Sequence, residues 1–216
     1  MKKLSIVVPA YNEEEVIELF YNKLKDVINK IVEKYEYEII FIDDGSKDNT
    51  LNILKKLREN DNNVNIISFS RNFGKEAGIY AGLKNSNGDI VVVLDADLQH
   101  DPEIIPQMIK YIEEGYDTVT TIRNRKGESK INSWFSNMFY RIMAGNKEVK
   151  LKKGSQDFRM MTRQVVEAIL DLKEYNRFSK GIFSWVGFKT KYIEVENKKR
   201  VAGKSKWNLM EFNEII

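Results

Sequence analysis

The sequence has 216 residues, no cysteine and a formal net charge of +3 at neutral pH. This length is enough for one domain with a sizeable hydrophobic core. The lack of cysteine excludes disulfide bonds and zinc–thiolate sites, and the small net charge gives no reason to expect a nucleic-acid partner. No apolar run approaches the roughly 20 residues that span a bilayer, so we expect neither a signal peptide nor a transmembrane helix within these residues.

Three β–α units follow one another in the first half of the chain. Each consists of a short apolar run, a polar loop and a stretch with helical periodicity. Asp48 or Asn49 is the expected N-cap of the second helix, and Gly88 is the expected C-cap of the third. Alternating elements predict an α/β fold, with a mostly parallel sheet and helices on both faces. The expected strands are 4–9, 38–43 and 64–70, and apolar stripes run through 16–31 and 51–57.

A fourth buried strand, 90–94, ends in the polar stretch DADLQHD. Pro102 then suits the first turn of a helix. Ligands of open α/β sheets bind at the carboxyl ends of the strands, which is where these polar side chains are expected. Asp95 and Asp97, with the amide oxygen of Gln99, suit a hard divalent cation such as Mg²⁺ or Mn²⁺. A solvated acidic turn is the alternative that this motif alone leaves open.

The second half of the chain differs from the first in its sequence pattern. A polar, mostly basic loop over 123–130 precedes a wide apolar stripe at helical spacing between Ile131 and Met143. That stripe belongs either to the core or to a helix at a membrane surface, with Trp and Phe on one face and basic residues around it. The other expected elements are strands over 117–122, 157–161 and 189–195, and helices over 163–172 and 178–186.

Six motifs stand in the order found in inverting family 2 glycosyltransferases: VVPAYNEE, DDGS, RNFGKEA, DADLQHDPE, QDFRMM and RVAGKSKW. Over nearly its whole length the chain resembles the branch that moves a sugar from a nucleotide onto a polyprenyl phosphate. Dolichyl-phosphate mannose synthases and undecaprenyl-phosphate glucosyltransferases belong to this branch. The resemblance implies a GT-A fold, which has a Rossmann-like sheet. It also implies a UDP- or GDP-hexose donor, a divalent metal and a membrane-bound lipid phosphate acceptor.

The resemblance assigns donor and metal roles to particular residues. Asp97 corresponds to the principal metal ligand, and Gln99 is a second candidate ligand. Lys75 is placed near the donor phosphates, although a solvated lysine at a helix start is equally compatible with the sequence. His100, the only histidine, is interpreted as a loop residue and not as a base. The positions matched to donor binding are Pro9, Tyr11, Glu13, Asp44, Lys75 and Asp95.

Asp157, in QDFRMM, matches the family position commonly assigned as catalytic base. A phosphate monoester is already largely dianionic at pH 7, since its second pKa is about 6, and needs no base. With a lipid phosphate acceptor, Asp157 would instead orient the acceptor or oppose positive charge on the sugar. Arginine side chains match phosphate geometry, although each is equally compatible with a solvated charge. The candidate acceptor-phosphate residues are Arg123, Arg125, Arg141, Arg200, Lys204 and Ser205.

We therefore predict one catalytic domain over 1–216, with a nucleotide-sugar-binding half (1–100) and an acceptor half (101–216). The predicted reaction is metal-dependent, inverting transfer of a hexose to a polyprenyl phosphate at the cytoplasmic face of the cell membrane. The amphipathic segment 207–216 leads us to expect either peripheral attachment to the membrane surface or a longer protein with transmembrane helices beyond it.

Other functions fit less well or remain open. Transfer to a saccharide hydroxyl in surface polysaccharide synthesis is the alternative reaction, and a non-catalytic module that retains the fold is the alternative from another class. A sugar-1-phosphate nucleotidyltransferase would need a glycine-rich basic loop after the first strand, where this chain has AYNEE. A dinucleotide-binding oxidoreductase is disfavoured because no G-x-G-x-x-G follows a strand.

Overall fold

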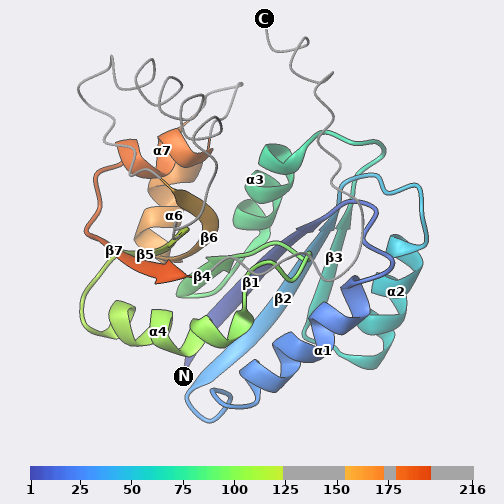
Figure 1. Cartoon of the computed structure of the whole chain (residues 1–216), viewed down its shortest axis with the longest axis horizontal. Coiled ribbons are helices and arrows are strands. Elements are labelled where there is room, and N and C mark those ends of the chain that lie inside the picture. Colours follow the sequence, from blue (N-terminus) through green and yellow to red (C-terminus); the bar gives the residue numbers. More distant parts are fainter. Residues whose placement is uncertain (124–153, 173–178, 196–216) are drawn as a thin grey trace, which may run out of the picture.

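A seven-stranded sheet forms the centre of the computed structural model, which describes residues 1–123, 154–172 and 179–195 (Figure 1). The strand order is β3-β2-β1-β4-β6-β5-β7. All pairings are parallel except those of β6, which runs antiparallel to both of its neighbours. The strands are β1 (Lys2–Ala10), β2 (Tyr35–Asp43), β3 (Val64–Ser68), β4 (Ile90–Val93), β5 (Thr118–Arg123), β6 (Ser155–Thr162) and β7 (Thr190–Val195).

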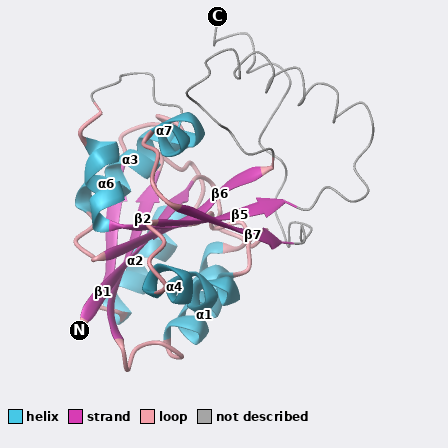
Figure 2. Ribbon diagram, turned by 90° about the vertical axis from the view of Figure 1, so that its left-hand side faces the viewer, coloured by secondary structure: helices cyan, strands magenta, loops and turns pink. Residues whose placement is uncertain are grey.

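Helices cover both faces of this sheet, as the side view in Figure 2 also shows. One face carries α1 (Ile17–Ile28), α2 (Thr50–Asn60), the short 3-10 helix η1 (Pro102–Ile104) and α4 (Ile105–Glu113). The opposite face carries α3 (Lys75–Asn85), α6 (Arg163–Leu170) and α7 (Ser179–Trp185). The predicted α/β fold, mostly parallel with helices on both faces, is therefore confirmed.

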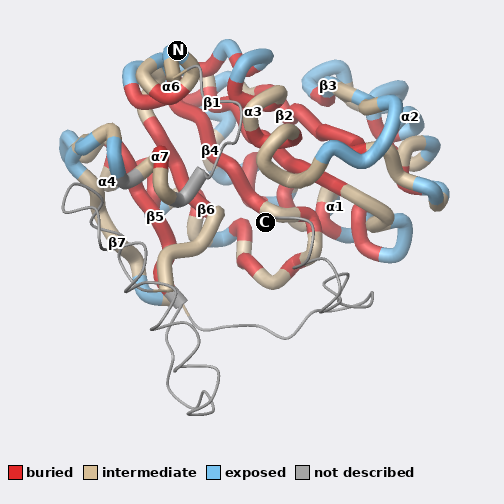
Figure 3. The backbone as a smooth tube through the Cα atoms, turned by 90° about the horizontal axis from the view of Figure 1, so that it is seen from above, coloured by how far each residue is buried: buried red, intermediate tan, exposed pale blue. Residues whose placement is uncertain are grey.

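The core lies on both sides of the central strands because successive side chains of a strand point to opposite faces. Val92 packs in the cluster beneath α1 and α4, whereas Val91 and Val93 pack in the cluster beneath α3 and α6. Figure 3 shows β1, β2 and β4 buried along most of their length, while α2 exposes its outer side. Each large apolar side chain buried in this way contributes about 1.5–3 kcal/mol to stability.

The prediction that Gly88 caps α3 is wrong. The helix ends at Asn85, and the residue after it, Ser86, is already extended, with ψ at 138°. The Gly88 N–H donates a hydrogen bond to the Ser5 Oγ (2.7 Å), and a Cβ at Gly88 would lie 2.6 Å from the Ser5 nitrogen. Glycine is needed here because the chain passes very close to β1 on its way into β4.

The predicted N-cap of α2 is divided between two neighbouring residues. Asn49 occupies the cap position, but its side chain makes no capping hydrogen bond. The Asp48 Oδ1 accepts the N–H of Thr50 instead (3.0 Å). Pro102 opens η1 as expected, directly after Asp101.

Several predicted segments lie outside the described residues: the basic loop from 124 onward, the stripe between 131 and 143, and the amphipathic segment 207–216. In the part of the chain that the structure describes, no helix is both long enough and apolar enough to cross a bilayer.

Candidate active site

The candidate site lies at the edge of the sheet where β1, β2 and β4 end. These three strands are parallel, so the loops that follow them meet at one edge. Because β6 is antiparallel to β4, its first residues lie at this same edge. The pairing of β6 with β5 shifts register between Thr120 and Ile122, opposite the segment that contains Asp157. Irregularities of this kind often re-aim side chains next to active sites.

Lys75 joins two of the predicted site residues. Its Nζ lies 2.7 Å and 2.8 Å from the two carboxylate oxygens of Asp95, and 2.6 Å from the Asp157 Oδ2. Burial would lower the pKa of Lys75, but the carboxylates of Asp95 and Asp157 outweigh it and raise that pKa above its ordinary value. The ammonium group therefore stays charged at neutral pH, and it links the loop after β4 to the start of β6.

Asp44 fixes the loop that carries Lys75. Its side chain is buried, and its two oxygens accept the N–H groups of Phe73 (2.7 Å) and Gly74 (3.0 Å). Burial raises the pKa of Asp44 more than these two hydrogen bonds lower it. A carboxylate has lone pairs for further hydrogen bonds, so its predicted contact with a nucleoside stays a prediction.

Gly45 permits the close approach of the loops after β2 and β3. A Cβ at this position would lie 2.3 Å from the backbone carbon of Arg71, and Gly45 has a φ of 66°. The glycine of the DDGS motif therefore brings the end of β2 against the segment that leads to Lys75.

The loops after β1 and β2 are bonded to each other. The Asn12 N–H donates to the Ser46 Oγ (2.9 Å), and the Glu13 N–H donates to the Thr50 Oγ1 (2.8 Å). Tyr11 and Glu13 are half-buried at this rim, whereas Pro9 is fully inside the sheet. Tyr11 and Glu13 are therefore better placed than Pro9 to meet a ligand.

The DADLQH segment alternates between inward and outward side chains. Asp95, Asp97 and Gln99 are half-buried, whereas Ala96, Leu98 and His100 are buried. Leu98 has a φ of 59°, and the Asp97 Oδ1 accepts the N–H of Gln99 (3.1 Å). Positive φ at a residue other than glycine is unfavourable and clusters at functional sites.

This oxygen-rich segment fits a hard cation, provided that the substrate supplies further oxygens. Among the described residues, no group of three or more acidic or histidine side chains is arranged to hold a metal ion. Mg²⁺ sites commonly use one or two carboxylates together with substrate phosphates. Asp97 and Gln99 are thus the candidate ligands, while Asp95 is already paired with Lys75.

The acceptor side of the site is described only in part. Arg123 is the last residue of β5, at the carboxyl end of that strand. The other candidate acceptor residues, Arg125, Arg141, Arg200, Lys204 and Ser205, lie outside the described residues. Their roles stay predictions.

His100 is more closely associated with the site than the sequence indicated. Its ring is 9% exposed, its Nδ1 lies 3.9 Å from the Asp95 Oδ2, and its centroid is 5.6 Å from that of Phe158. Burial lowers the pKa of His100, against the opposing effect of Asp95. No local pattern around His100 indicates this burial, because it depends on Phe158 of β6.

Arg159 is a second residue that the sequence did not single out. It is 3% exposed, its guanidinium carbon lies 3.7 Å from the centroid of the Phe183 ring, and it donates to the Gln156 carbonyl oxygen (3.0 Å). Burial lowers the pKa of Arg159 to about 10, and the nearby charge of Asp157 opposes that change. The contact with Phe183 comes from α7, which no local pattern around Arg159 indicates.

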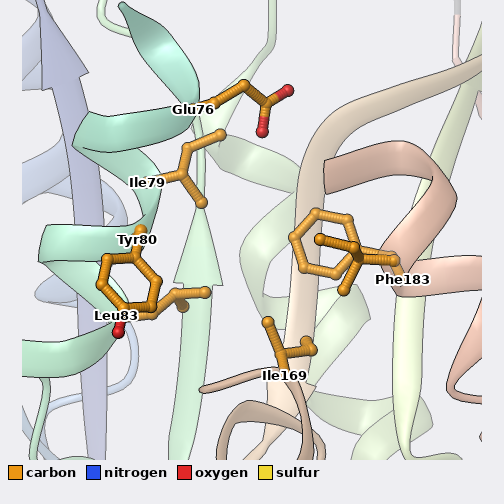
Figure 4. A pocket seen from close by; sticks show the side chains of 7 residues that line it. Glu76, Ile79, Tyr80, Leu83, Ile169 and Phe183 are labelled. Atoms are coloured by element: carbon orange, nitrogen blue, oxygen red, sulfur yellow. The ribbon is translucent and has the colours of Figure 1, made fainter. Parts of the chain in front are cut away.

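The packing of α3 against α6 and α7 leaves a narrow gap (Figure 4). Ile79 and Leu83 face Ile169 and Phe183 across it, and Glu76 stands at one end. The enclosed space is only about 10 Å³, at the lower limit for holding even one water molecule. This gap is therefore part of the core and not a ligand site.

An open, mostly parallel sheet with acidic residues at its carboxyl edge is the architecture of a GT-A glycosyltransferase. A family model described as "Glycosyl transferase family 2" matches residues 5–170, which is more than half of the chain. The chain therefore belongs to glycosyl transferase family 2, and the predictions of the family and of a glycosyltransferase are confirmed.

Individual relatives agree with this assignment. CsbB of Bacillus subtilis (strain 168), named as a glycosyltransferase, is 48% identical over 205 residues, which cover 95% of this chain and 62% of CsbB. The bactoprenol glucosyl transferase of Shigella phage SfX is 42% identical over 207 residues, covering 95% of this chain and 67% of that protein. The chain thus spans less than two thirds of the length of CsbB.

A solved structure shares the fold. The mannosyltransferase PcManGT from Pyrobaculum calidifontis, in complex with GDP-Man and Mn²⁺, matches with a TM-score of 0.66 and 17% identity. The match covers 93% of this chain and 57% of that one. At this identity the likeness supports the GT-A fold alone.

Proposed function

We propose that this chain transfers a hexose from UDP- or GDP-hexose to a polyprenyl phosphate, with inversion at the anomeric carbon. The single observation that carries the proposal is the bridge from Lys75 to Asp95 and Asp157, which unites the candidate donor and catalytic residues. The similarity to a bactoprenol glucosyl transferase supports a polyprenyl phosphate as acceptor. Because such a lipid is confined to a membrane, the reaction would take place at a membrane surface. We propose that this is the cytoplasmic surface.

The charge arrangement favours a phosphate acceptor over a hydroxyl acceptor. A hydroxyl must lose its proton to a base, but the Asp157 carboxylate is already engaged by the Lys75 ammonium group at 2.6 Å. A phosphate monoester is already largely dianionic at pH 7. Asp157 is thus suited to orient the acceptor and to oppose the positive charge that develops on the sugar.

The residues around Asp157 then have distinct tasks. Lys75 positions Asp157 against the loop after β4, and it offers a positive charge beside the donor phosphates. Asp97 and Gln99 would hold a divalent cation, which stabilises negative charge on the leaving diphosphate as a Lewis acid. Support for a cation in this fold comes from the Mn²⁺ bound in PcManGT.

The test is to incubate the protein with Mn²⁺, a panel of UDP- and GDP-hexoses, and undecaprenyl phosphate in detergent. We expect one of the nucleotide hexoses to give a glycolipid that partitions into organic solvent. Efficient glycosylation of a soluble saccharide, with no glycolipid from any donor, would contradict the proposal.

A further inference from the structure

A cavity of about 320 Å³ lies beside the candidate cation site. It is bounded by the loop after β4, by η1 and the first turns of α4, and by β6 and β7. Its size is at the lower end of the roughly 300–1,000 Å³ range of small-molecule pockets, which suits one ring better than a whole nucleotide. None of the residues matched to nucleoside binding lines it.

The cavity combines an apolar wall with polar groups. Ile104, Phe158 and Ile193 form the apolar part, whereas Gln99, Gln107 and His100 supply hydrogen-bonding groups. An apolar surface with a few polar groups is typical of a small-molecule binding site.

His100 is the strongest indication that something binds here. Its ring is nine-tenths buried, and within the described residues neither ring nitrogen has a hydrogen-bond partner. Buried polar atoms in folded proteins are nearly always hydrogen-bonded. A neutral imidazole offers one donor and one acceptor, so a ligand hydroxyl can satisfy either nitrogen.

The charges of the described residues at the rim disfavour an anionic ligand. Three acidic residues, Asp101, Glu103 and Glu194, line the cavity, and none of the described lysines or arginines does. Asp101 pairs with Lys23 (3.0 Å) and Glu103 pairs with Lys30 (2.6 Å), so part of this negative charge is compensated from α1 and the residues that follow it. A phosphate would be repelled by such a lining, whereas an uncharged ring with hydroxyl groups would not.

We propose that this cavity binds an uncharged sugar ring, and that this ring is the hexose of the nucleotide-sugar donor. The proposal rests on the proposed function. Gln99 lines the cavity and lies two residues beyond Asp97, where the donor diphosphate is expected. The cavity therefore adjoins the residues proposed to hold the diphosphate, and the hexose is the part of the donor attached to that diphosphate. The ring of a saccharide acceptor is the other source of the same chemistry.

The test compares the affinity for a nucleotide with that for its hexose conjugate, by calorimetry in the presence of Mn²⁺. We expect Gln107→Leu and His100→Phe each to weaken binding of the nucleotide hexose by about three- to tenfold, the effect of one lost hydrogen bond. Affinity for the nucleoside diphosphate alone should stay within twofold of wild type. The matched control is Lys110→Leu, on the same helix but not in the cavity wall, and it should change neither affinity.

Each outcome separates this proposal from the proposed function. The sugar-binding proposal would be overturned if both variants kept the wild-type affinity for the nucleotide hexose. It would also be overturned if they lost affinity equally for the nucleotide hexose and for the nucleoside diphosphate. Unchanged donor affinity together with a raised KM for a soluble saccharide would assign the ring to the acceptor and make the donor assignment wrong. If the variants lose affinity for the nucleotide hexose only, but the wild-type protein makes no glycolipid, the result would support the sugar-binding role of the cavity and contradict the proposed lipid acceptor. If the wild-type protein binds no nucleotide sugar, both proposals fail. Gln107 is exposed, so Gln107→Leu remains informative even if His100→Phe does not fold.

Discussion

The two ends of the central strands both hold charged groups, but they hold them in different ways. At the amino ends of β1 and β2, Glu38 accepts hydrogen bonds from the Ser5 Oγ (2.6 Å), the Asn87 N–H (2.8 Å) and the Lys3 Nζ (3.0 Å). At the carboxyl ends, Asp95 and Asp157 are only part-buried and share Lys75. The Glu38 carboxylate is buried and its hydrogen bonds are all made within the protein, whereas the carboxylates of Asp95 and Asp157 remain accessible to a ligand. We infer that the first stabilises the fold and the second performs chemistry.

Asp97→Asn should give the largest effect on activity. The substitution keeps the shape of the side chain but weakens its hold on a cation, so transfer should fall at least a hundredfold. Thermal stability should change little because the residue is half-buried in a loop. The assay is glycolipid formation, and the control variant is Asp26→Asn, on the exposed side of α1. Treatment of the wild-type protein with EDTA should reproduce the loss of activity. Full activity in Asp97→Asn would refute the metal assignment.

Lys75→Met should have the next largest effect. Without the ammonium group, Asp95 and Asp157 lose the charge that holds them together, and we expect kcat to fall about ten- to a hundredfold. Lys84→Met, in the last turn of the same helix, is the control. A kcat within twofold of wild type would show that the bridge has no role in turnover.

Glu38→Gln should have the opposite effect: it should lower stability and leave activity unchanged. An amide cannot accept from all three donors, so the free energy of unfolding should fall by about 1–3 kcal/mol. Activity per folded molecule should be unchanged, since Glu38 lies at the far end of the strands. Urea unfolding of Glu38→Gln is compared with that of Glu36→Gln, an exposed residue of the same strand. Equal stability of the two variants would contradict a stabilising role.

The smallest expected effect is a pH dependence of the folding stability that arises from the titration of Glu38. Burial raises the pKa of Glu38, but the bonds from Ser5, Asn87 and Lys3 outweigh it and hold that pKa below its ordinary value of 4.5. The stabilisation is therefore complete above pH 4.5 and is lost as the pH falls through the lower value of the folded state. The stability difference between wild type and Glu38→Gln should shrink over the pH interval that begins at 4.5 and extends downward. A constant difference over that interval would exclude this titration.

The same contrast explains what could be predicted from the sequence. The strands expected over 4–9, 38–43 and 90–94, which correspond to β1, β2 and β4, could be predicted because an apolar run followed by a polar loop is a local pattern. Asp95 and Asp97 were predicted as site residues because they follow such a run directly, whereas Asp44 was predicted from the family resemblance; the roles of all three stay predictions. That the loops after β1, β2 and β4 meet at one edge also follows from the parallel direction of these strands.

Features that depend on distant contacts were missed. The burial of Arg159 depends on Phe183 of α7, and the close approach of Gly88 depends on Ser5 of β1. The antiparallel direction of β6 also has no local signal, because QDFRMM indicates a strand without indicating its partner. His100 was placed in a loop correctly, but its burial depends on packing against Phe158.

The most direct test of the central claim is Asp157→Asn, with glycolipid formation and nucleotide-hexose affinity measured on the same preparation. We predict that kcat for transfer to undecaprenyl phosphate falls about a hundredfold or more, because the neutral amide no longer opposes charge on the sugar. Affinity for the nucleotide hexose should stay within threefold of wild type, since the proposed role of Asp157 is to orient the acceptor and to oppose charge that develops during transfer. Unchanged glycolipid formation by Asp157→Asn would contradict the account.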